Sequence, residues 1–155
     1  MTEQVEAVDL SKEPVLIRIL SSSSTVYYVD ARGEHPTLMR ARGDGRTHAS
    51  ALDNQWLYLR GIDSYRGDEG PFASPASGHG VLRVGFRHQY WWHEADHSRA
   101  PLGSFRPRLS DTTWWLQRTA QSIELLDEMP APDALTRDAD EVDFLDGPHR
   151  GGVDA

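Results

Sequence analysis

The sequence predicts a mainly β protein, a curled antiparallel sheet or small barrel of about six or seven strands. Short runs rich in β-branched and aromatic residues are separated by turn-forming residues, and the chain holds 13 Gly and 9 Pro. The clearest run, residues 81–92, alternates apolar and polar side chains as a half-buried strand does. Both observations favour strands over helices.

Charge and composition divide the chain into three parts. The net charge is -8, but the acidic excess lies at the two ends, while residues 14–118 contain more Arg than acidic residues. We expect an acidic flexible N-terminus (1–13), a single β-rich domain (14–128) and an acidic, disordered tail (129–155). Alternatively, the acidic and apolar segment 142–146 docks on the core or on a partner.

The first four strands are expected at residues 15–20, 25–30, 37–42 and 55–60. Each is rich in the residue types that fit a pleated sheet. Serine, glycine or charged residues separate the runs and predict turns between them. Residues 64–80 are rich in Gly and Pro and predict a long loop.

The last part of the domain contains one clear strand and one ambiguous segment. In the strand 81–92, Leu82, Val84, Phe86, His88, Tyr90 and Trp92 share one face, and Gly85 marks a bulge or bend. Residues 112–127 are read as a final hairpin that turns near 119–120, because Trp and Thr favour strands. The alternative is a C-terminal helix over 111–129, capped by Ser110 or Asp111.

Two short segments carry a resemblance to known proteins. Residues 24–30 (STVYYVD) and 118–123 (RTAQSI) are similar to the opening and closing strands of short, uncharacterised actinobacterial β-rich proteins. The match covers about a tenth of the chain, and the long loops and Trp pairs depart from it. No activity is attached to these proteins, so the resemblance implies a fold only.

Residues 93–97 (HEADH) match the H-E-x-x-H motif of zinc hydrolases. On a helix, His93 and His97 would bind zinc, and Glu94 would serve as general base. The preceding strand and Pro101 leave little room for such a helix. We therefore expect no catalytic residue, no metal ligand and no cofactor here, and keep the zinc hydrolase as an alternative.

The tryptophans are the main candidates for a binding surface. In a strand, the neighbours Trp91 and Trp92 point to opposite faces, as do Trp114 and Trp115. One ring of each pair is expected in the core and its partner outside, where paired aromatics are typical of an interface. The predicted surface consists of Trp56, Trp91, Trp92, Trp114, Trp115, Arg83 and Arg87.

Arginines occur about once per predicted strand. Arg18, Arg40, Arg60, Arg83 and Arg87 would gather on one wet face of an antiparallel sheet. Beside aromatic rings they would suit single-stranded nucleic acid, although the core is only mildly basic. Nucleic-acid binding is therefore a further alternative.

The sequence thus predicts a non-catalytic binding or interaction module that engages a protein partner or forms a homodimer. The chain has no Cys, so disulfides and thiolate metal sites are excluded. No apolar run reaches the roughly 20 residues of a membrane span, and no export signal is evident, so we expect a cytoplasmic protein with no membrane contact.

Overall fold

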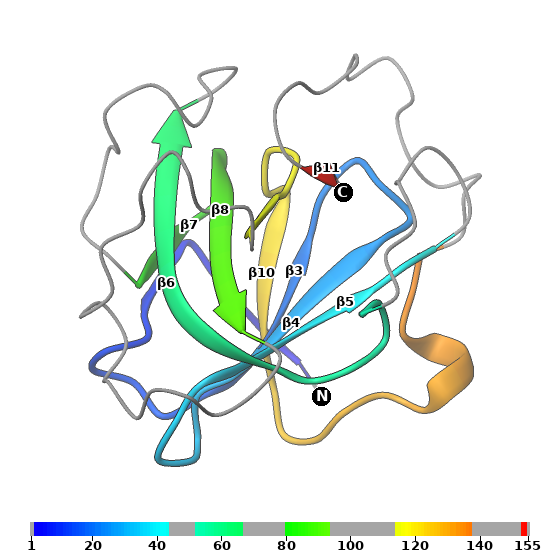
Figure 1. Cartoon of the computed structure of the whole chain (residues 1–155), viewed down its shortest axis with the longest axis horizontal. Helices are drawn as coiled ribbons and strands as arrows, with labels where there is room; N and C mark the ends of the chain where they lie inside the picture. Colours follow the sequence, from blue (N-terminus) through cyan, green and yellow to red (C-terminus); the bar gives the residue numbers. More distant parts are fainter. Residues whose placement is uncertain (1, 44–51, 67–79, 94–113, 138–152, 155) are drawn as a thin grey trace.

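We describe the chain from a computed structural model, which defines residues 2–43, 52–66, 80–93, 114–137 and 153–154. The prediction of a mainly β protein is confirmed (Figure 1). The described residues contain β-strands and one short 3-10 turn, η1 (Pro132–Ala134), and no α-helix. None of the helical structure in the described part of the chain is long and apolar enough to span a membrane.

One large sheet dominates the described residues. Its strand order is β1-β10-β3-β4-β5-β6-β8-β9-β11. All neighbours in it are antiparallel except β11, which lies parallel to β9. The strands are β1 (Glu3–Val5), β3 (Leu16–Leu20), β4 (Val26–Asp30), β5 (Thr37–Ala41), β6 (Leu57–Arg66), β8 (Phe86–His93), β9 (Trp114–Leu116), β10 (Ser122–Leu126) and β11 (Val153–Asp154).

The long strand β6 curves across the molecule (Figure 1). It pairs with the whole of β8, and the register shifts between Leu59 and Gly61. β6 also extends to Arg66, into the segment expected as a loop. The rest of that expected loop, 67–79, lies outside the described residues.

The expected single strand 81–92 is in fact two strands. β7 (Val81–Arg83) pairs with β2 (Ala7–Asp9) in a separate two-stranded sheet, and only β8 belongs to the large sheet. Between them Gly85 has φ 89°, a conformation that glycine adopts readily because it lacks a Cβ. The apolar positions Leu82, Tyr90 and Trp92 do enter the core, but the chain turns at Gly85, and β8 is buried on its polar face too, at Arg87 and Gln89.

Residues 114–126 form neither the helix nor the hairpin considered above. β9 and β10 do not pair with each other: β9 pairs with β8, whereas β10 pairs with β3 and β1. The connection between them continues both pairings. The Gln117 and Ala120 amides donate to β8, at His88 O (2.9 Å) and Phe86 O (2.8 Å), and the Gln121 amide donates to Leu20 O of β3 (2.7 Å).

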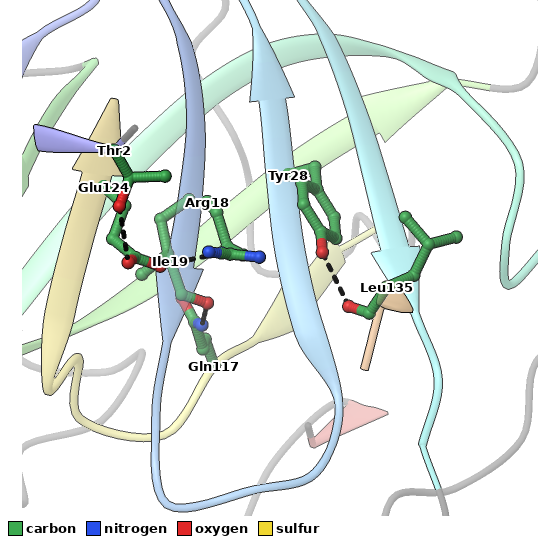
Figure 2. Close-up of polar contacts among 7 residues, drawn as sticks. All are labelled: Thr2, Arg18, Ile19, Tyr28, Gln117, Glu124 and Leu135. Atoms are coloured by element: carbon green, nitrogen blue, oxygen red, sulfur yellow. Dashed lines mark hydrogen bonds and ion pairs between the residues drawn. The ribbon is translucent and has the colours of Figure 1, made fainter. Parts of the chain in front are cut away.

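Side chains reinforce this connection. The Gln117 Nε2 donates to Ile19 O of β3 (3.1 Å), and its Oε1 accepts from the Tyr90 hydroxyl of β8 (2.5 Å). Figure 2 shows the Gln117–Ile19 contact, together with the ion pair between Arg18 of β3 and Glu124 of β10. The Arg18 Nε lies 2.7 Å from the Glu124 carboxylate. The segment is therefore hydrogen-bonded to both β8 and β3.

The main core joins residues from strands far apart in the sheet order. Tyr27 of β4 stacks on Tyr90 of β8, with ring centroids 4.7 Å apart. Trp115 meets Tyr27 edge-on at 6.2 Å and packs against Trp92 at 4.9 Å. Around this aromatic centre lie the buried aliphatic side chains Val8, Leu10, Ile17, Ile19, Val29, Leu38, Leu57, Leu59, Ile62, Leu82 and Ile123.

A smaller apolar cluster lies on the opposite face of β4 and β5. It consists of Val26, Tyr28, Met39 and Ala41, with Leu20, Leu126, Met129 and Leu135 packed against it. The Tyr28 hydroxyl donates to Leu135 O (2.6 Å; Figure 2), and the Arg137 amide donates to Ser24 O (2.9 Å). Residues 129–137, expected as the start of a disordered tail, are therefore fastened to the sheet.

Both expected flexible ends contain ordered strands. Residues 3–9, assigned to the flexible N-terminus, form β1 and β2 instead. β11 joins residues 153–154 to β9, whereas residues 138–152, which include 142–146, lie outside the described residues. Hydrophobic alternation over only three residues is too short to identify such strands from sequence.

Candidate functional site

The aromatic candidates lie on strands β8 and β9, where the register separates two faces. Trp91 is opposite Trp114, and Tyr90 is opposite Trp115. Because directly opposed residues share a face, Tyr90, Trp92 and Trp115 point into the main core. The other face, here called the outer face, carries Asp63, Tyr65, Arg87, Gln89, Trp91, Trp114 and Leu116.

The prediction that one ring of each Trp pair enters the core is confirmed. Trp92 and Trp115 are both buried in it. Their neighbours form a second pair on the outer face, where the ring centroids of Trp91 and Trp114 are 6.0 Å apart. The expectation that these rings lie outside is wrong for Trp91, which is 5% exposed, whereas Trp114 is half-buried.

The outer face is polar as well as aromatic. The Tyr65 hydroxyl donates to Gln89 Oε1 (3.0 Å), and Arg87 Nε donates to Gln117 O (3.2 Å). Burial, and then the nearby Asp63 carboxylate, raises the pKa of Tyr65. Tyr65 is therefore neutral at pH 7, and its hydroxyl proton is the one donated to Gln89.

Two of the predicted surface residues lie elsewhere. Trp56 directly precedes β6 and is 38% exposed, the most exposed large hydrophobic side chain among the described residues. The strand that follows Trp56, β6, begins its pairing with β8 at Tyr58, which lies opposite His93. Arg83 is exposed on β7, which pairs with β2. The structure thus brings Trp91 and Trp114 together and places Arg83 in the other sheet.

The H-E-x-x-H motif begins in a strand. β8 includes His93, so this residue is extended, whereas a zinc hydrolase of this type carries both histidines on one helix. Glu94 and His97 lie outside the described residues. Within the described ranges, no group of three His, Asp or Glu side chains converges as a metal-binding set.

The expected wet face of arginines does not form as a continuous row. Arg40 and Arg87 are buried, the latter only 7% exposed, and Arg18 pairs with Glu124. A groove that tracks phosphates needs several accessible cations. The expectation of a solvent-facing basic row is therefore wrong for Arg40 and Arg87.

His88, which shares the apolar face of the predicted strand 81–92, is fully buried. Its Nε2 accepts a hydrogen bond from the Arg83 amide (3.0 Å), while its Nδ1 finds no partner among the described residues. Burial lowers the pKa of His88 to about 3. The imidazole is therefore neutral, and it ties β8 to β7.

The interior holds an ion pair that the sequence did not predict, because Arg40 was expected on a solvent-facing surface. Arg40 of β5 is completely buried and pairs with Asp53, with Nε and Oδ1 2.7 Å apart. The Arg40 guanidinium also lies over Trp115, 4.5 Å from the ring centre. Alternation in the predicted strand 37–42 could have indicated that Arg40 is buried, because residues two apart in a strand share a face and Leu38 lies in the core. No local sequence pattern indicated that Asp53 would pair with Arg40.

Comparisons of the chain with family models, with curated proteins and with solved structures gave no match. The resemblance to actinobacterial β-rich proteins therefore stays a prediction. The arguments below rest on the geometry of the chain alone.

Proposed function

We propose that the chain is a non-catalytic binding module, and that it engages a protein partner, in the first instance a second copy of itself. The proposed contact surface is the end of the sheet formed by the start of β6, the end of β8 and the start of β9. The observation that carries the proposal is the exposure of Trp56 beside the strand end at His93. Trp114, half-buried against Trp91, lies on the outer face of the same strands.

Tryptophan is suited to this role. Indole rings bury a large apolar area and are enriched among the residues that contribute most to protein interfaces. The Tyr65 hydroxyl and the Gln89 amide of the outer face are buried and contact each other at 3.0 Å, so they do not belong to the exposed contact surface. An exposed indole ring suits a protein partner better than it suits a phosphate backbone.

We also propose that the large sheet closes into a small barrel. Tyr27 and Tyr90 stack at 4.7 Å although β5 and β6 separate their strands in the sheet order. In a flat sheet, three strand spacings would hold them roughly 14 Å apart. The bonds of residues 117–121 to both β8 and β3 support closure at the point where these strands approach.

Closure of the sheet into a barrel favours partner binding at the outside of the barrel over ligand binding inside it. Eight strands give a barrel that is just wide enough for its interior side chains, so about six strands leave no room for a sizeable ligand. The interior is occupied by Tyr27, Tyr90, Trp92 and Trp115 with their aliphatic neighbours. A macromolecular partner would therefore contact the strand ends, where Trp56 is exposed.

The test compares two exposed positions at opposite ends of β6. Wild-type protein is expected to show a mass that rises with concentration in sedimentation equilibrium. Trp56→Ala should weaken self-association at least about 10-fold, because it removes the exposed ring. The matched variant Arg66→Ala, at the far end of β6, should change it less than about 2-fold.

Two results would contradict the proposed self-association. One is a wild-type protein that stays monomeric at millimolar concentration. The other is an equal effect of both substitutions. Thermal unfolding of each variant shows whether the fold itself has changed.

A further inference from the structure

The ion pair between Arg40 and Asp53 lies where β5 and β6 separate. These strands share only two residue pairs, Thr37 with Tyr58 and Leu38 with Leu57. Beyond them, Arg40 O accepts a hydrogen bond from the Asn54 amide (2.9 Å) rather than from β6. A loop, residues 52–55, thus takes the place of a strand beside the end of β5.

This loop is hydrogen-bonded to the end of β5. The Asn54 Oδ1 accepts from the Arg42 amide (3.2 Å), and Asn54 adopts φ 64°, a left-handed conformation that is uncommon for residues other than glycine. The side chain of Asp53 is 6% exposed, and that of Arg40 is 0% exposed. The loop therefore brings a carboxylate from the place where β5 and β6 separate to a guanidinium in the core.

A third polar group faces the same place. Tyr27 of β4 lies directly opposite Arg40 of β5, so both side chains point into the core. The buried Tyr27 hydroxyl has no hydrogen-bond partner of ordinary geometry among the described residues. Burial raises the pKa of Tyr27, and the opposing effect of Arg40 is smaller. A neutral phenol that can donate thus lies beside a guanidinium.

This set of groups is suited to a carboxylate. A guanidinium presents several N–H donors in a fixed plane that matches a carboxylate. Trp115 covers one side of the Arg40 guanidinium at 4.5 Å, which fixes its orientation. A buried hydroxyl without an acceptor is unusual in a folded protein and indicates an unfilled polar position.

We propose that Arg40, Tyr27 and Trp115 form a site for a small monocarboxylate, and that Asp53 occupies it as an internal stand-in. The ligand's carboxylate replaces that of Asp53 on Arg40 and accepts the Tyr27 hydroxyl proton in a hydrogen bond. The loop 52–55 moves outward to admit the ligand. The site adjoins the proposed protein-binding surface, because the loop 52–55 directly precedes Trp56, but it does not depend on self-association.

Chemical rescue tests this site. Asp53→Ala removes the stand-in and is expected to lower the midpoint of thermal unfolding, because it leaves Arg40 buried without its counter-ion. Sodium acetate at pH 7 should raise that midpoint by roughly 3 °C relative to sodium chloride of equal ionic strength. The double variant Asp53→Ala/Arg40→Met should show no difference between the two salts.

Asp53→Asn serves in the same experiment if Asp53→Ala does not fold. Folded wild-type protein gives an independent measurement, since its tryptophan fluorescence should change saturably with acetate and not with chloride. Equal effects of the two salts would overturn the proposal, as would an acetate effect that survives Arg40→Met. So would the absence of any acetate-specific change, which would leave the ion pair a purely structural contact.

Discussion

At the scale of single residues, burial decides which polar groups carry charge. His88 is enclosed beside Tyr90, with ring centroids 6.3 Å apart, and hydrogen-bonds through Nε2 to the Arg83 amide. Protonation would turn Nε2 from an acceptor into a donor and break this bond. The neutral form is therefore part of the fold.

His88 should make the protein sensitive to acid. Its pKa is lowered from 6.5 to about 3 in the folded chain. Its contribution to stability is therefore complete above about pH 6.5 and is lost progressively as the pH falls toward 3, because the unfolded chain binds the proton first. Over that window the loss approaches about 1.4 kcal/mol per pH unit.

Denaturant titrations between pH 7 and pH 4 measure this effect. The variant His88→Gln keeps an acceptor for the Arg83 amide but does not titrate. Its free energy of unfolding should fall less steeply with acid than that of wild type. Parallel curves for the two proteins would show that His88 does not carry the effect.

At the scale of elements, close approaches of the backbone determine where the strands pass each other. Gly43 follows β5 and lies against the β3–β4 connection, where its amide donates to Thr25 Oγ1 (3.0 Å). A Cβ at Gly43 would come within 2.7 Å of the Ser24 carbonyl carbon and oxygen. The contact is with backbone and cannot be relieved by a change of rotamer.

Gly43→Ala should therefore destabilise the protein by about 2 kcal/mol or more, as overpacking does. Gly33→Ala is a matched control, since a Cβ there meets nothing within 4 Å, and it should change stability by less than about 0.5 kcal/mol. Chemical denaturation of both variants measures the difference. Similar values for the two would contradict the close approach at Gly43.

The elements also show how far local pattern predicts structure. The runs around 15–20, 25–30 and 37–42 were predicted within a residue or two, because each contains the residue types of a sheet. The sequence did not predict the turn at Gly85 or the separate partners of β9 and β10. Strand pairing is a contact between distant segments, and the sequence of one segment does not determine which strand it pairs with.

At the scale of the whole molecule, the proposed closure of the sheet depends on residues 117–121. The amides of Ala120 and Gln121 bond to opposite neighbours, β8 and β3. In a closed sheet both amides should exchange with solvent only when the whole domain unfolds.

Native-state hydrogen exchange followed by NMR measures this protection. The Ala134 amide, which bonds to Ala131 O in the exposed turn η1, is the reference for local opening and should exchange far faster. If Gln121 exchanged as fast as Ala134, the seam between β8 and β3 would be open. Protection of Ala120 and Gln121 equal to that of the central strands is the expected result.

The sequence by itself determined the β class, the position of most strands and the entry of one ring from each Trp pair into the core, because these follow from local alternation and residue type. Only the tertiary structure decided which strands are neighbours, that Trp91 and Arg87 are buried, and that Asp53 meets Arg40. Those outcomes depend on contacts across the sheet, where burial and pairing are settled by distant residues rather than by the local chain.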